Sequence, residues 1–284
     1  MIKRSEFFRK KRYIAIITGV LCFSVLCGIL LTKAKNIGNK EITTTEANTK
    51  NLEKAVSQAI KEEGKDYLEG EYITEGHTIL GTEKNKNKIK VYSLASVGYF
   101  GFENGIFTDI SGSGAIPTVM IFEKKKDGTY LLKEYKEPAD GSDQEESIKE
   151  LFPEKYYDKV LALNDEYSVL AKQQETQAAQ YLKSIGRKAE VRVSYVDKQL
   201  PSINTEASNK LFAEYMNNDS FLMTCPYWLG TREEIEDDIR YIYETSQSKT
   251  EDGYDLITFQ KKTEDNTVVE KRSYKIVGSE PMLL

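Results

Sequence analysis

Histidine and cysteine are scarce in this chain of 284 residues, which contains one histidine, His77, and three cysteines. A zinc site built on histidines and an HExxH peptidase helix each need a second histidine, so the count excludes both. Cys22 and Cys27 lie in one apolar segment, which leaves Cys225 as the single cysteine elsewhere. No internal disulfide framework can form, and the fold must therefore be held by its core.

Charge is missing from a run of twenty residues, Tyr13 to Thr32. An apolar helix of about 20 residues can cross a hydrocarbon layer roughly 30 Å thick. Six basic residues lie in residues 1–12, whereas three lysines follow the run closely, and the positive-inside rule then predicts a cytoplasmic N-terminus. We expect a cytoplasmic tail at 1–12, a transmembrane helix at 13–32 that contacts the lipid bilayer, and a stem at 33–45.

Two other fates of this segment are a cleaved signal peptide and a lipid anchor. A cleaved signal has an apolar stretch of about 7–15 residues and a small-x-small site, but the candidate site Thr32-Lys33-Ala34 contains a lysine. A lipidated cysteine follows small residues, whereas Cys22 and Cys27 each follow a Val-Leu pair. We therefore favour an uncleaved anchor in the cell membrane with an extracellular C-terminal domain. The abundance of Lys, Ile, Asn and Tyr is typical of a low-GC Gram-positive source.

The extracellular part is acidic. Residues 1–12 contribute +5 to a net charge of −5, so the remainder carries −10. This excess makes nucleic acid an unfavourable partner, and it also keeps a domain soluble. The glycine-rich segment 112–117 lacks a nucleotide-binding pattern and predicts a bulge or bend in a strand. We expect no cofactor and no bound metal.

The first half of the domain reads as α+β. Leu52, Val56 and Ala59 recur at helical spacing and predict a helix over 45–63. Asn104-Gly105 and Asp127-Gly128 are hairpin signals of type I′. Together with the polar turn 83–87 they predict a meander of four antiparallel strands between residues 72 and 135. Helices follow over three ranges: 142–152, 154–163 and 164–185, the last with Asn164 or Asp165 as its cap.

A second, smaller α+β unit is expected over 188–284, after a first unit at 46–187. A strand over 191–196 and a short helix capped by Thr205 open the second unit. The capping box Thr231-Arg-Glu-Glu234 predicts a helix with Ile235, Ile239 and Ile242 on one face, although the chain from Ile239 also reads as the start of a strand. Turns at 252–253 and 265–266 then flank two final strands, 254–261 and 268–277.

Three residues are candidates for binding a ligand or partner. His77 lies in a predicted strand, where a lone histidine is either a polar packing residue or a contact residue. Tyr227 and Trp228, the latter the only tryptophan, form either an exposed recognition patch or part of the core, since aromatic residues dominate both. No catalytic residue is assigned, because acidic pairs occur throughout a chain with 45 acidic residues.

Four segments of the chain resemble the extracytoplasmic C-terminal region of some clostridial membrane proteins of the peptidase-antirepressor group, which senses β-lactams. The resemblance covers roughly 69–277 and implies a sensor-like domain outside the membrane. It does not imply peptidase activity or acylation, because this chain has one predicted anchor, no HExxH helix and no acylatable serine motif. The segments are EGHTILG at 75–81, SGSGAIP at 111–117, SIKELFP at 147–153 and YLKSIGR at 181–187.

These observations predict a single-pass, membrane-anchored, extracytoplasmic binding or sensor-like protein that is not an enzyme. A tail of twelve residues is too short to signal alone, so a membrane or envelope protein partner is expected. Two alternatives stay open: an exported hydrolase that uses carboxylates on cell-wall material, and a purely structural envelope protein. Two acids about 5–10 Å apart in a deep cleft would favour the hydrolase.

Overall fold

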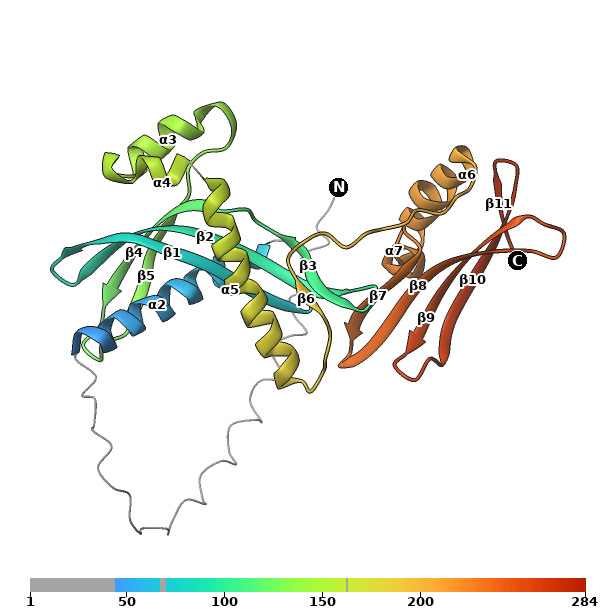
Figure 1. Cartoon of the computed structure of the whole chain (residues 1–284), viewed down its shortest axis with the longest axis horizontal. Coiled ribbons are helices and arrows are strands. Elements are labelled where there is room, and N and C mark those ends of the chain that lie inside the picture. The colour runs from blue at the N-terminus through green and yellow to red at the C-terminus, as the bar shows by residue number, and fades with distance from the viewer. Residues whose placement is uncertain (1–43, 67–69, 162) are drawn as a thin grey trace, which may run out of the picture. The chain divides into compact units, whose positions relative to one another are not determined.

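The computed structural model describes residues 44–66, 70–161 and 163–284 (Figure 1). The predicted tail, the predicted anchor Tyr13–Thr32 and nearly all of the predicted stem lie outside these residues. Within the described part of the chain, no helix is long and apolar enough to cross a membrane. The described fold is α+β, with six α-helices and eleven strands that belong to one sheet, antiparallel except for one short pair.

The N-terminal half of the sheet is a meander around the long strand β2 (Lys88–Glu103). Strand β1 (Tyr72–Asn85) pairs with one edge of β2, and β3 (Ile106–Gly112) and β4 (Ile116–Lys124) pair with the other. Strand β5 (Tyr130–Lys136) then pairs with β4. The predicted four-stranded meander is confirmed, with its third strand divided into β3 and β4 at the glycine-rich bend.

The turns of this meander follow the sequence signals. Asn104 and Gly105 have φ angles of 51° and 75°, as a type I′ hairpin requires, and they join β2 to β3. Of the second pair, Gly128 alone has a positive φ, 84°, so this turn joins β4 to β5 as expected but is not type I′. Glycine and asparagine tolerate these left-handed angles best, and for this reason the sequence predicts the positions of the turns.

Helices cover both faces of this half-sheet. Odd-numbered residues of β2 such as Val91 and Val97 pack against α2 (Thr44–Glu63), whose predicted apolar stripe is buried. Even-numbered residues of β2 face the other side, where Leu94 packs in one core with Leu170 of α5 (Leu163–Ser184). Because side chains alternate along a strand, α2 and α5 lie on opposite faces. Two shorter helices join the α5 side: α3 (Gln144–Leu151) and α4 (Tyr157–Leu161).

The C-terminal half continues the sheet with five antiparallel strands. Helices α6 (Thr205–Asn209) and α7 (Ser220–Thr224), with a π-helical turn at Lys210–Tyr215, cover the core formed by Ile257 and Phe259. One pairing, Glu103 with Arg232, connects β2 to β7. The five strands are β7 (Gly230–Glu236), β8 (Ile239–Lys249), β9 (Asp255–Thr263), β10 (Val268–Val277) and β11 (Glu280–Leu283).

The helix predicted from the capping box at Thr231–Glu234 is wrong. Residues 230–249 form the hairpin of β7 and β8, and Asp237 and Asp238 at its turn have φ angles of 49° and 65°. These angles end a helix, and Ile235 and Ile239 are about half exposed rather than on a buried stripe. The alternative interpretation, a strand starting at Ile239, is confirmed.

Three smaller expectations also need correction. The predicted strand over 191–196 is short, since β6 spans only Val191–Arg192 and pairs in parallel with β3. Asn204, not Thr205, caps α6, because its side chain accepts the backbone N–H groups of the second and third residues that follow. The last strand, β11, was not predicted. The turns near Gly253 and Asn266 lie where expected.

Candidate functional site

His77 lies on the face of β1 that meets α2. On this strand the odd-numbered residues share the α2 face, so Glu75 and His77 point the same way and approach Glu53 of α2. Gly76 points to the opposite face, where a Cβ atom would lie 2.4 Å from the backbone oxygen of Leu170. Glycine at this position therefore lets α5 approach β1 closely, while the residues on either side turn toward α2.

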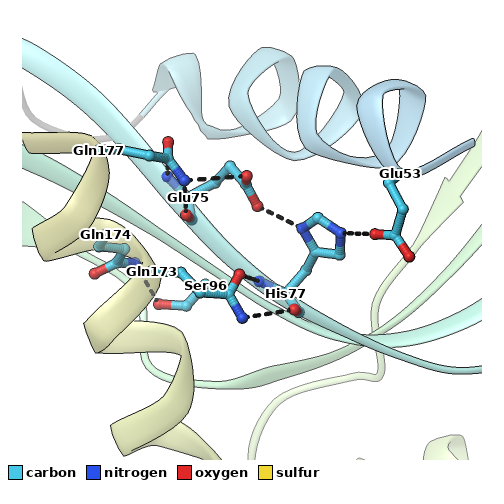
Figure 2. Close-up of polar contacts among 7 residues, drawn as sticks. All are labelled: Glu53, Glu75, His77, Ser96, Gln173, Gln174 and Gln177. Carbon is cyan, nitrogen blue, oxygen red and sulfur yellow. Dashed lines mark hydrogen bonds and ion pairs between the residues drawn. The ribbon is translucent and has the colours of Figure 1, made fainter. Parts of the chain in front are cut away.

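The imidazole of His77 is held between two carboxylates (Figure 2). Its Nδ1 lies 2.7 Å from Oε2 of Glu75, and its Nε2 lies 2.7 Å from Oε2 of Glu53. A neutral imidazole carries one N–H and can donate to only one of these acceptors, whereas the imidazolium can donate to both. The geometry therefore fits protonated His77 with two charge-assisted hydrogen bonds.

The local electrostatics agree with that geometry. Burial by itself lowers the pKa of His77, but the hydrogen bonds and negative charges of Glu75 and then Glu53 outweigh burial and raise the pKa above its ordinary value. Burial likewise acts to raise the pKa of Glu75, but the hydrogen bond and charge of His77, followed by Ser57 and Lys61, lower it overall. Glu75 thus stays ionised where His77 takes up its proton.

Protonation of His77 changes the net charge of the cluster that it forms with its neighbours. Glu53 and Glu75 carry two negative charges and Lys61 one positive charge, so the cluster has a net charge of −1 when His77 is neutral and zero when it is protonated. Glu75 is almost fully buried, whereas the side chain of Glu53 is 47% exposed and can move into water. Loss of the proton therefore weakens the contact between α2 and β1 first.

Two glutamines of α5 bind the backbone of β1 beside this cluster (Figure 2). Oε1 of Gln173 accepts the N–H of His77 at 3.0 Å, and Nε2 of Gln173 donates to the carbonyl of His77 at 3.0 Å. Gln177 makes the same pair of bonds with Glu75, at 3.3 and 2.6 Å. Residues four apart on a helix and two apart on a strand have similar spacing, so these carboxamides bind β1 as a neighbouring strand would.

A second polar cluster lies on the α5 face around Gly98. Nε2 of Gln174 donates to Oγ of Ser96 at 3.0 Å, but its buried Oε1 has no hydrogen-bond partner among the described residues. A Cβ atom on Gly98 would lie 3.1 Å from that Oε1 and 3.2 Å from Oδ2 of Asp109. Burial raises the pKa of Asp109 to about 6, against weaker lowering by backbone hydrogen bonds from Ser111 and Tyr99.

The His77 arrangement favours proton-linked contact over bond-making chemistry. Both ring nitrogens are engaged by carboxylates on opposite sides of the ring, so neither nitrogen is open to a substrate and the two acids cannot share one metal ion with it. Over residues 44–66, 70–161 and 163–284, no group of three or more His, Cys, Asp or Glu side chains is arranged to hold a metal ion. Burial raises the pKa of the Cys225 thiol to about 12, which makes it a poor nucleophile.

Tyr227 and Trp228 do not form a shared exposed patch. Trp228 is fully buried, and the Nζ of Lys198 and the guanidinium of Arg232 lie 4.1 Å and 5.0 Å from its ring centroid. Tyr227 is 52% exposed and meets the tryptophan edge-on, with ring centroids 5.0 Å apart. Trp228 is therefore a core residue, as one of the two interpretations held, and only Tyr227 is accessible to a partner.

Comparisons with known protein families, with curated proteins and with solved structures found no match. The resemblance to membrane sensors of the peptidase-antirepressor group stays a prediction.

Sequence reasoning identified His77 but missed the residues that define its chemistry. Glu75 could have been found, because it shares a strand face with His77 two positions away. Glu53 could not, since its contact with His77 depends on how α2 docks on the sheet. Gln173 and Gln177 carry a signal that was overlooked: polar side chains four residues apart beside the apolar stripe of a long helix.

Proposed function

We propose that this chain is a single-pass, membrane-anchored, extracytoplasmic binding or sensor-like protein without enzymatic activity, and that protonation of His77 controls how firmly α2 binds the sheet. The observation that carries the proposal is the pair of 2.7 Å contacts from one imidazole to Glu53 on α2 and Glu75 on β1. Helix α2 directly follows the predicted stem, so a change in its docking is passed to the anchor and to a membrane partner.

Hydrogen exchange on the full chain in lipid nanodiscs tests this proposal. After correction for the intrinsic effect of pH, amides of α2 should be better protected at pH 5.5 than at pH 8, because the imidazolium holds Glu53. His77→Gln should remove most of this difference, whereas Lys86→Gln in the turn between β1 and β2 should leave it intact. Equal protection of α2 at both pH values in the unaltered chain would refute the coupling.

Partner capture tests the membrane part of the proposal. Cross-linking in intact membranes, followed by purification of the full chain, should recover an envelope protein, and digestion with the purified chain should leave peptidoglycan unchanged. The purely structural interpretation predicts a partner that is held equally at pH 5.5 and pH 8. A partner held differently at the two pH values supports the sensor interpretation.

One observation favours the hydrolase as a second candidate. A cavity of about 260 Å³ lies between the C-terminus of α2 and the strands β2, β4 and β5, and both Glu63 and Glu137 line it. Partial burial of its carboxyl, aided by the charges of Glu63 and Asp140, raises the pKa of Glu137, and glycosidases use a carboxyl of raised pKa together with a second carboxylate. Both acids are exposed, which gives little exclusion of water.

Substitution of the acid pair separates the two candidates. If the full chain releases sugars from peptidoglycan and Glu137→Gln abolishes the release while Glu134→Gln does not, the hydrolase is correct. If neither substitution matters because no release occurs, the binding function stands.

A further inference from the structure

A pocket of about 400 Å³ opens in the C-terminal half, away from the His77 cluster. The π-helical turn and the residue that follows it contribute Phe212 and Met216, and α7 contributes Met223. The segment before β7 contributes Tyr227, and β7 itself contributes Arg232. We call this the Tyr227 pocket. Its volume lies within the range of small-molecule sites, roughly 300–1,000 Å³, and π-helical turns occur frequently at functional sites.

One side of the Tyr227 pocket is apolar and partly uncovered, while Ser208, Asn209 and Asn217 make the rest of the wall polar. Met223 is 59% exposed and Tyr227 is 52% exposed, whereas Met216 and Cys225 are buried beneath them. Water-facing apolar side chains around a concavity lose solvent contact when an apolar ligand enters. Methionine side chains also adapt to different ligand shapes, because they are unbranched and polarisable. This side therefore fits a compact apolar group.

Arg232 adds an incompletely neutralised positive charge to the pocket. Both Arg232 and Lys198 pair with the same carboxylate, Glu103, but Lys198 lies 2.8 Å from it and Arg232 only 3.7 Å. The Nε of Arg232 is buried and has no hydrogen-bond partner within the described part of the chain. Among these three groups, two cations share one carboxylate, so Glu103 cannot neutralise Arg232 fully.

We propose that the Tyr227 pocket binds a small carboxylate with an apolar body, the carboxylate on Arg232 and the body against Phe212, Met216, Met223 and Tyr227. This proposal rests on the proposed binding function and supplies the class of ligand for it. An acyl carboxylate and an aryl carboxylate share the required chemistry. A guanidinium binds a carboxylate through paired hydrogen bonds, and a neutral amide of the same shape lacks the charge that strengthens them.

Fluorescence of the single tryptophan measures binding directly. Trp228 contacts Tyr227 and lies 5.0 Å from the guanidinium of Arg232, so a ligand on Arg232 should change its emission. The full chain in lipid nanodiscs is titrated with octanoate, with 4-phenylbutyrate and with the matching neutral amides. We expect saturable binding of at least one acid and about tenfold weaker binding of its amide. The stronger acid identifies the acyl or the aryl source.

Variants locate the site. Arg232→Gln should weaken acid binding about tenfold while leaving amide binding unchanged. Met223→Ala should weaken acid and amide alike, whereas Met282→Ala, at an equally exposed methionine on β11, should change neither. Because Met223 is at the surface, this variant keeps the test valid if Arg232→Gln fails to fold.

Two results would overturn the pocket: no saturable response to either acid, or equal affinity for acid and amide. If neither acid binds but the amide protection of α2 still depends on pH, the pocket proposal is wrong and the proposed function stands. If the protection of α2 does not depend on pH but an acid still binds, the coupling through His77 is refuted and the pocket proposal stands.

Discussion

Polar contacts in the two halves of the sheet differ in how they respond to protons. In the N-terminal half, His77 and Asp109 lie on opposite faces of the sheet. The pKa of His77 is raised above its ordinary value of 6.5, and that of Asp109 is raised from 3.8 to about 6. Where the halves meet, the contacts are made by arginine. Arg240 binds Glu71 through two 2.6 Å hydrogen bonds and Glu233 through one of 3.0 Å. Arginine stays charged across the physiological range, so Arg240 keeps its positive charge in this junction.

The difference indicates a division of roles. The hydrogen bond and charge of Glu71 raise the pKa of Arg240 still further, against the effect of burial, so the guanidinium keeps its charge at pH 5.5 and at pH 8 alike. In the N-terminal half, by contrast, the contact between α2 and β1 depends on the proton of His77, whose pKa is raised, and Asp109 on the α5 face loses its proton as the pH rises through about 6. We infer that the junction provides rigidity and that the N-terminal half provides the response.

Breaking the junction should have the largest effect. Arg240→Ala removes the cation that binds the nearly buried Glu71 through two hydrogen bonds and leaves Glu233 with Arg187 as its remaining partner, and removal of one partner of a buried ion pair costs about 3–5 kcal/mol. The free energy of unfolding from urea titration should fall by about this amount at both pH 5.5 and pH 8. Lys149→Ala, which removes an exposed pair with Glu145, is the control and should change little. A loss that appears at only one pH would contradict a fixed junction.

Separating α5 from β1 should have the next largest effect. Gly76→Ala forces a methyl group to within 2.4 Å of the backbone of Leu170 and stretches the hydrogen bonds of Gln173 and Gln177 to β1. We expect a loss of about 1–3 kcal/mol in unfolding experiments and faster amide exchange at Glu75 and His77. Gly114→Ala, where nothing lies within 4 Å of the new methyl, is the matched control. Equal stability of the two variants would mean that the close approach of α5 is unnecessary.

Asp109 should impose a smaller, pH-dependent effect. Because burial raises its folded pKa to about 6, above its ordinary value of 3.8, the stability that neutral Asp109 allows is fully present below 3.8 and is lost as the pH rises from there through about 6. Asp109→Asn keeps the shape of the neutral acid and should be more stable than the unaltered chain at pH 8 by about 1–2 kcal/mol, with a clearly smaller difference at pH 4.5. Thermal unfolding at the two pH values measures this. A variant that is less stable at pH 8 would show that ionised Asp109 is held favourably.

Local signals in the sequence were enough to predict much of the N-terminal half. Asn104-Gly105 correctly predicted a hairpin, and the spacing of Leu52, Val56 and Ala59 correctly predicted the buried face of α2. The hairpin of β7 and β8 was missed because Ile235, Ile239 and Ile242 also fit a helix. Strand pairing between Glu236 and Ile239 depends on the turn at Asp237 and Asp238, where both residues have left-handed φ angles. A pair of aspartates predicts such a turn less clearly than Asn-Gly does.

The candidate site could be predicted only in part, because its residues come from separate elements of the chain. His77 stood out because it is the only histidine, but Glu53 lies 24 residues away and reaches it only after α2 packs on the sheet. Trp228 stood out as the only tryptophan, yet its contacts with Lys198 and Arg232 join segments on either side of α6 and α7. Contacts that unite separate elements follow from tertiary packing, which no local spacing encodes.

A titration of His77 by NMR tests the central claim most directly, and the single histidine makes its ring signals unambiguous. In the full chain the pKa of His77 should lie above its ordinary value of 6.5, with both ring nitrogens protonated at pH 5.5 and with α2 amide signals shifting along the same curve. Glu53→Gln should lower that pKa toward 6.5. A pKa at or below 6.5 in the unaltered chain, or α2 signals that ignore the titration, would contradict the account.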